Sequence, residues 1–201
     1  MNIIKTNLNY RKPLVPLILS KVLFLIVHHI DAKFATPEDI HQWHLDNGWN
    51  GFGYNEYIRK DGTVYIGRGD NIGAQCANMN SKSFGIALEG NFDIEDLDTN
   101  SAQFKSLVER LKYHKERFKN LVEIGPHGKY VATTCPGSKF PFEQLLDAVN
   151  NINNEFINAV NTLHLNNIIS SADYWLENAV EGKTVRGDYA QILIKNMSKK
   201  L

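Results

Sequence analysis

Imidazole and thiol side chains occur at three places where their chemistry could bind a metal ion. The apolar run Leu23–Val27 ends in His28, and His127 and Cys135 follow about a hundred residues later, with seven residues between them. Neutral imidazole and thiolate are ligands that zinc takes in tetrahedral sites. A His and a Cys at this spacing are common by chance, however. On spacing alone, the simpler interpretation of Cys135 is a buried thiol before the Pro136-Gly137 turn.

The position of His28 depends on the strand that precedes it. Residues 22 to 28 are predicted to form a buried strand, because a short apolar run is typical of the centre of a sheet. Open α/β sheets bind their ligands at the carboxyl ends of such strands. His29 points to the opposite face by alternation, so we expect it to be structural. Residues 1 to 20 are expected to form an irregular arm that packs across the domain.

Other patterns predict helices and strands on both sides of this strand. Thr36 is a helix N-cap, with Pro37 at the first helical position and Asp39 three residues after the cap. The segment Lys60–Thr63 predicts a hairpin turn. Periodicity predicts strands at 83–88 and 121–124 and helices at 101–119 and 141–151. The sequence therefore predicts one α/β domain.

Several short motifs occur in a recognisable order: Val27-His28-His29, Trp43-His44, Gly53-Tyr54, Lys60-Asp61-Gly62-Thr63 with Gly67-Arg68, the run Ser83–Phe92, and His127-x7-Cys135-Pro136-Gly137. Over about residues 22 to 148, this order resembles the zinc N-acetylmuramoyl-L-alanine amidases. That superfamily is shared by small phage amidases and peptidoglycan recognition proteins. The resemblance implies an α/β fold with a mixed central β-sheet flanked by α-helices and a zinc ion in a surface cleft.

The resemblance also implies a site. His28, His127 and Cys135 would be the ligands of one catalytic Zn²⁺, with the fourth position left for water or substrate. Tyr54 matches a tyrosine beside the zinc, and Thr133 matches a position that carries lysine in the phage enzymes. Both would stabilise the oxyanion, Thr133 more weakly than a lysine would.

The implied reaction is hydrolysis of the amide that joins the N-acetylmuramoyl lactyl group to L-alanine in peptidoglycan. Arg68 and Asn80 occupy family positions near the peptide-binding groove. Hydrogen bonds that stabilise their own loops would explain both residues equally well.

Two other functions compete with the amidase. A non-catalytic recognition module would hold peptidoglycan in the same groove, but the presence of Cys135 together with Tyr54 favours catalysis. A thiol hydrolase would use Cys135 as nucleophile and His127 as base, which leaves His28 without a role.

Composition limits the partners. Basic and acidic residues number 22 each, so the formal net charge is zero, and this argues against nucleic acid as the main partner. Two cysteines make no disulfide framework, and Cys76 is expected to be a small buried side chain. The apolar stretch before residue 28 is interrupted and lacks a typical cleavage site. We therefore expect no signal peptide and no membrane span, with synthesis in the cytoplasm and later action on the cell wall, as for a phage endolysin.

A polar stretch near residue 152 divides the chain. We expect a catalytic domain at 1–152 and a small helical domain at 153–201 with two or three short helices. The runs 168–175 and 187–194 resemble appendages of clostridial-type amidases. A core this small is marginal alone, so we expect this part to serve targeting or formation of a homo-oligomer. His41, His114 and His164 are expected on the surface.

Overall fold

The computed structural model describes residues 1–150, 154–180 and 182–199. The chain divides into two compact units, residues 1–150 and residues from 151 onward, and each is described by itself. The boundary expected near residue 152 lies outside the described residues.

A mixed β-sheet forms the centre of the first unit. Its six strands, counted over the described residues, have the order β1-β4-β3-β5-β2-β6. β3 and β4 are antiparallel, and the other neighbouring pairs are parallel. The strand bounds are β1 Ile3–Lys5, β2 Phe24–His29, β3 Glu56–Ile58, β4 Val64–Ile66, β5 Ser83–Leu88 and β6 Glu123–Pro126. The predicted mixed sheet is confirmed.

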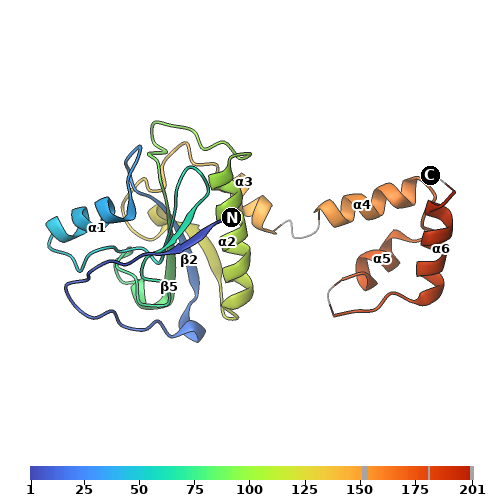
Figure 1. The fold of residues 1–201 in the computed structure, drawn as a ribbon, viewed down its shortest axis with the longest axis horizontal. Helices are drawn as coiled ribbons and strands as arrows, with labels where there is room; N and C mark the ends of the chain where they lie inside the picture. The colour runs from blue at the N-terminus through green and yellow to red at the C-terminus, as the bar shows by residue number, and fades with distance from the viewer. Residues whose placement is uncertain (151–153, 181, 200–201) are drawn as a thin grey trace. The chain divides into compact units, whose positions relative to one another are not determined.

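Helices cover both faces of this sheet. α2 (Ala102–Arg117) and α3 (Phe142–Asn150) pack on one face, and α1 (Pro37–Asp46) lies on the other side (Figure 1). Alternation along β2 and β5 explains the two layers, since Val27 and Ile86 face α2 while Ala87 belongs to the α1 side. The capping box predicted for α1 is present, with Thr36 Oγ1 accepting from the Asp39 N–H at 3.1 Å.

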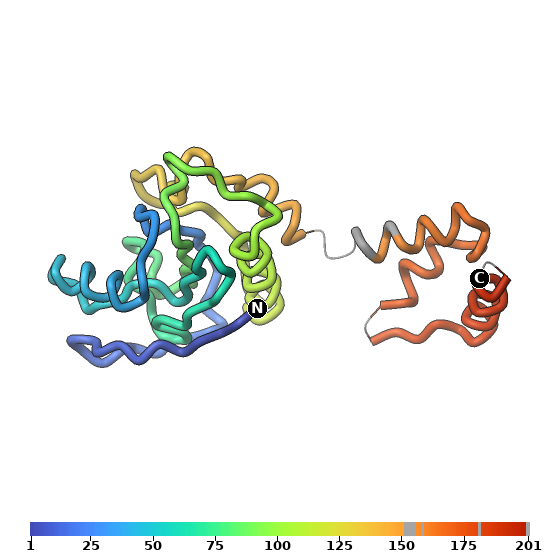
Figure 2. Tube along the Cα trace, turned by 45° about the horizontal axis from the view of Figure 1, so that its top comes forward, coloured from blue at the N-terminus to red at the C-terminus, as the bar shows by residue number. Residues whose placement is uncertain are grey.

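Part of the amino-terminal arm is a strand, which the sequence reading did not predict. β1 pairs in parallel with β4 as the outermost strand, and both views place the N-terminus beside α2 (Figures 1 and 2). Three residues at a sheet edge with half-exposed isoleucines give too short a pattern to recognise. Short 3₁₀ turns lie at η1 (Leu19–Lys21), η2 (Asn80–Lys82) and η3 (His127–Lys129).

Two histidines expected on the surface are buried. His114 on α2 is fully buried because its Nε2 bonds Glu56 Oε1 at 2.9 Å, and Arg110 donates to the same carboxylate at 2.5 and 2.9 Å. His41 is also buried, and its Nδ1 accepts the Phe52 N–H at 3.0 Å. The expectation was wrong for both histidines. Their partners, a carboxylate for His114 and backbone groups for His41, cannot be predicted from the pattern of apolar residues.

The second unit contains helices α4 (Asn154–Leu165), α5 (Ala172–Asn178) and α6 (Gly187–Met197). Val160, Ile169 and Trp175 form its buried core, and the rings of Tyr174 and Tyr189 stack with centroids 3.7 Å apart. In the described part of the chain, no helix is both long and apolar enough to cross a membrane.

Candidate metal centre

Strand pairing brings the first two candidate ligands together. β2 and β6 are parallel neighbours with Val27 opposite Pro126, and in both segments the next residue along the chain is a histidine. His28 ends up fully buried and His127 opens η3, and their ring centroids lie 4.3 Å apart. Residues a hundred positions apart therefore become neighbours through backbone hydrogen bonds.

The third candidate ligand lies on an anchored loop. The Gly128 N–H donates to the carbonyl of Cys135 at 2.8 Å. Asp93 accepts from Thr134 Oγ1 and from the Ser138 N–H, both at 2.9 Å. These bonds on either side of Cys135 fix its backbone, so the sulfur position is set by the fold.

A glycine is required in the same loop. Gly137 has a φ of 114°, and a Cβ atom there would lie 2.3 Å from the backbone carbon of Phe92. No side chain fits this approach. Thus the Pro-Gly turn after Cys135 presses the loop against the segment that follows β5.

The three donor atoms form a compact set. One ligand atom from each of His28, His127 and Cys135 lies within 4.8 Å of the other two. His28 Nδ1 is 3.8 Å from Cys135 Sγ. Ligand atoms of a tetrahedral zinc site with N and S donors are about 3.5 Å apart, from bond lengths of about 2.0 and 2.3 Å. Two imidazoles and one thiol at this separation fit Zn²⁺ with one open position.

Burial sets the protonation of these groups. It lowers the pKa of His28 and His127, so both imidazoles are neutral and hold a lone pair for a metal at neutral pH. Burial raises the pKa of the Cys135 thiol to about 12. A divalent metal binds the thiolate, so metal binding here would release a proton from sulfur.

Gln75 determines which nitrogen of His28 is free. His28 Nε2 is 2.6 Å from Gln75 Oε1, while Gln75 Nε2 donates to Ser83 Oγ at 2.8 Å. The Ser83 hydroxyl in turn donates to the Met79 carbonyl at 2.9 Å, so it must accept from Gln75. The amide oxygen therefore faces His28, Nε2 carries the hydrogen, and the Nδ1 lone pair faces Cys135.

A cavity of about 290 Å³ opens beside these groups. Tyr54 lines it, with its ring centroid 5.2 Å from that of His28, and burial raises its pKa so that the hydroxyl stays protonated. Thr133 also lines the cavity and is exposed, and its Oγ1 accepts the Cys135 N–H at 3.3 Å, which leaves the hydroxyl hydrogen free. The cavity thus holds three metal-binding atoms and two hydroxyl donors.

Comparison with known proteins assigns the chain that carries this site to a protein family. The family model described as N-acetylmuramoyl-L-alanine amidase matches residues 19–138, more than half of the chain. The chain belongs to this amidase family. All five residues described above as candidate ligands or hydroxyl donors lie within the matched range: His28, Tyr54, His127, Thr133 and Cys135.

Relatives of this amidase-family chain include lytic enzymes and recognition proteins. The endolysin amidase LysCS from Clostridium intestinale matches with a TM-score of 0.68 and 33% identity, covering 74% of this chain and 95% of that one. The endolysin of Klebsiella phage KP32 is 34% identical over 116 residues, 54% of this chain and 76% of the phage protein. Peptidoglycan-recognition protein SC1a of Drosophila melanogaster is 30% identical over 125 residues, 57% of this chain and 68% of that protein.

Two further histidines near the centre are held by the backbone of the amidase fold. His29 Nδ1 accepts the Phe92 N–H at 3.1 Å, as expected of a structural histidine. His44 Nδ1 accepts the Gly53 N–H at 3.0 Å, and burial lowers its pKa to about 4, so the ring is neutral. His44 lines the cavity, but its bonds brace the loop that carries Tyr54.

The two residues predicted to bind substrate lie in different places. Asn80 lines an adjoining, largely apolar groove of about 480 Å³, which shares His127 with the metal centre. Its Oδ1 accepts the N–H groups of Gln75 and Cys76 at 2.9 and 3.0 Å. Cys76 is buried, as predicted.

Arg68 lines a separate cavity and donates to the carbonyls of Phe52 and Ile72 at 2.7 and 3.0 Å. Arg68 and Asn80 both make loop-stabilising bonds, and a role in substrate binding stays a prediction. Sequence reasoning missed Gln75, because a lone amide in a loop has no spacing signal.

Proposed function

We propose that this protein is a zinc-dependent peptidoglycan hydrolase that cleaves the amide between the N-acetylmuramoyl lactyl group and L-alanine. The observation that carries the proposal is the compact set of His28, His127 and Cys135 donor atoms in a cavity that Tyr54 also lines. Membership of the amidase family and similarity to endolysins support it.

The residues of the chain would divide the chemistry as follows. His28, His127 and Cys135 hold the ion, which when bound supplies a water that ionises near neutral pH and polarises the substrate carbonyl. Tyr54 is protonated at neutral pH, so its hydroxyl can donate to the oxyanion that develops on that carbonyl. Thr133, with its hydroxyl hydrogen free, is a second donor from the opposite loop.

The partner is therefore bacterial peptidoglycan, and the place of action is the cell wall, by analogy with the endolysin relatives. A pure recognition module is the second candidate, because peptidoglycan-recognition proteins are relatives at 30% identity. The complete ligand set together with Tyr54 favours hydrolysis over recognition.

A thiol hydrolase is disfavoured by the environment of Cys135. Nucleophilic cysteines have a lowered pKa, whereas burial raises the pKa of Cys135 to about 12. In the proposed zinc centre, Cys135 and His28 are both metal ligands, whereas the thiol hydrolase would leave His28 without a role.

The test is release of free amino groups from purified cell walls by metal-free and zinc-loaded protein. Release should stop after complete chelation and return when zinc is restored. Wall binding without release by zinc-loaded protein would establish the recognition module. Release that survives full zinc removal, or that alkylation abolishes while zinc stays bound, would refute the proposed mechanism.

The second unit is proposed to target the protein to the wall or to pair two copies of the chain. Exposed apolar side chains on α6, Ile192, Ile194 and Met197, support a contact surface there. Light scattering on the full chain and on a chain that ends at Asn150 would separate the two roles. If the full chain is a dimer and the truncated chain is a monomer, the second unit pairs two copies. If both chains are monomers, targeting to the wall is the remaining role.

A further inference from the structure

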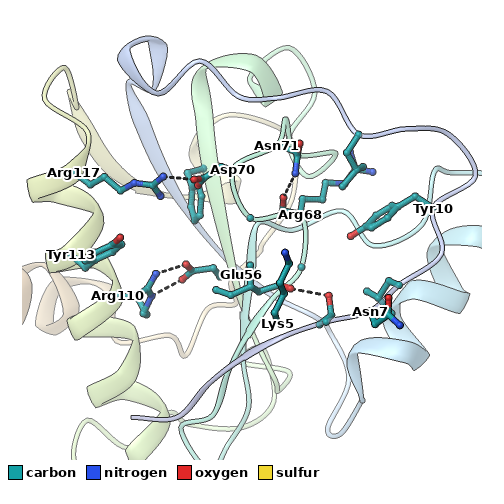
Figure 3. A pocket seen from close by; sticks show the side chains of 17 residues that line it. Lys5, Asn7, Tyr10, Glu56, Arg68, Asp70, Asn71, Arg110, Tyr113 and Arg117 are labelled. Carbon is teal, nitrogen blue, oxygen red and sulfur yellow. Dashed lines mark hydrogen bonds and ion pairs between the residues drawn. The ribbon is translucent and has the colours of Figure 1, made fainter.

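A second cavity lies in the first unit, between α2 and the amino-terminal arm (Figure 3). Its volume is about 610 Å³, and it shares no lining residue with the cavity of the metal centre. The end of β4, residues of the arm and the later turns of α2 form its walls. Nothing in the proposed hydrolysis uses this cavity.

The lining has a surplus of positive charge. Four basic side chains and two acidic ones contribute to it. Arg110 is paired with Glu56 and Arg117 with Asp70, as Figure 3 shows. The other two bases, Lys5 and Arg68, have no acidic partner in the part of the chain that the structure describes. Among the described residues, the charges of exposed Lys5 and buried Arg68 therefore have no acidic partner.

One of these charges is buried with an unused donor. Arg68 is 7% exposed, and its Nε and Nη1 are used on backbone carbonyls. Within the described residues, Arg68 Nη2 and the Tyr10 hydroxyl are buried polar atoms without a hydrogen-bond partner. The Arg68 guanidinium carbon lies 5.6 Å from the centroid of the Tyr10 ring. Buried donors normally have partners, so this pair indicates a missing acceptor.

We propose that this cavity binds the phosphate group of a small phosphorylated molecule, with Arg68 and Tyr10 as donors and Lys5 as a further counter-charge. A water molecule could accept from one donor, but it would not compensate the charge of a buried guanidinium. Phosphate carries about −1.5 to −2 at neutral pH, which matches the two basic side chains without acidic partners, and guanidinium groups bind it in a fixed fork. The cavity is larger than a phosphate group, so the rest of the ligand has room.

Inorganic phosphate is the probe for the test, titrated into the full chain by calorimetry at low ionic strength. We expect saturable binding with a Kd of about 1 mM or tighter. Tyr10→Phe removes only the hydroxyl and should weaken binding about tenfold, the effect of one charge-assisted hydrogen bond. Lys5→Gln should also weaken it, while Lys21→Gln, outside the cavity, should not. Wall hydrolysis measured without phosphate should be unchanged in all three variants.

Thermal unfolding of the phosphate-free protein separates a phosphate from a trapped water. Tyr10→Phe should leave the melting temperature unchanged or higher, since the hydroxyl it removes has no partner. A lower melting temperature with unchanged phosphate affinity would mean that a water fills the gap, and the proposal would fail. Acetate binding as tightly as phosphate, or no saturable phosphate binding in the millimolar range, would overturn it as well.

Discussion

Replacing Gln75 by methionine removes the hydrogen-bond acceptor of His28 Nε2 and the donor to Ser83 Oγ, and it leaves the size of the side chain nearly unchanged. The two side chains have similar length, and Gln75 is 8% exposed. In the native chain the 2.6 Å contact between His28 Nε2 and Gln75 Oε1 keeps the Nδ1 lone pair toward Cys135. In Gln75→Met the ring can take the other tautomer or rotate, and either change turns the lone pair away from the position proposed for the zinc ion.

The magnitude follows from that bond. Removal of a partner that orients a metal-bound histidine typically weakens metal affinity about 10- to 100-fold. This corresponds to about 1.4 to 2.8 kcal/mol of zinc-binding free energy. The variant Gln75→Glu keeps an acceptor at the same position, so its zinc affinity should equal or exceed that of the native chain.

A third variant should disturb the same hydrogen bond, between His28 and Gln75, by displacing the Gln75 side chain. Gly85 lies on β5 directly under Gln75, and a Cβ atom there would be 2.7 Å from Gln75 Cγ and Cδ. Gly85→Ala should therefore push the amide away from His28 and reproduce the loss in Gln75→Met. Ser83→Ala removes only the outer partner of Gln75 and should cost less.

The assay is competition for zinc with a chromophoric chelator at fixed pH, with thermal unfolding of the metal-free variants to verify the fold. Native zinc affinity in Gln75→Met, with the fold intact, would refute the argument that Gln75 orients His28. Equal losses in Gln75→Met and Gln75→Glu would show that packing, and not the acceptor, controls the affinity.

The remaining predictions concern the ligands, the oxyanion, the buried ion pair and the second unit. Cys135→Ser should abolish stoichiometric zinc binding and hydrolysis, as measured by metal analysis and amino-group release. Tyr54→Phe should keep zinc and lose about ten- to a thousandfold in rate, and an unchanged rate would remove Tyr54 from the mechanism. Burial lowers the pKa of His114; burial alone would raise that of Glu56, but bonds from His114 and Arg110 bring it below its ordinary value. The stability from His114 is complete above about pH 6.5 and that from Glu56 above about pH 4.5, and both are lost as pH falls, so the melting temperature should begin to drop below about pH 6.5 and drop further below about pH 4.5; a flat profile would contradict this. Deleting residues 151–201 should spare hydrolysis of soluble muropeptides and weaken action on intact walls; equal loss on both would place that unit in the catalytic fold.

The order of motifs along the chain carried more information than any single motif. Through the family resemblance that it carries, this order was sufficient to predict the mixed sheet, and β2, α1 and β5 each have a strong local pattern as well. It did not supply the register that sets Val27 opposite Pro126, and that register brings His28 and His127 together. Sheet register depends on long-range pairing, which a single sequence does not display.

The errors share a cause. His114 was expected at the surface, since a polar residue on an amphipathic helix usually faces solvent, yet it is fully buried against Glu56. Gln75 and β1 were missed because a single amide in a loop and a three-residue edge strand have no periodicity. The polar interactions of the interior are specific pairs of residues, so a pattern of apolar positions does not reveal them.

The parallel pairing of β2 and β6 has a consequence for how the proposed zinc ion would bind. Because backbone hydrogen bonds between the strands place the two imidazoles side by side, and Asp93 anchors the loop that carries Cys135, we expect the three donor atoms to be positioned by the fold before a metal binds. Zinc would then bind to a domain that is already folded. This differs from a zinc finger, whose chain folds only when its metal binds.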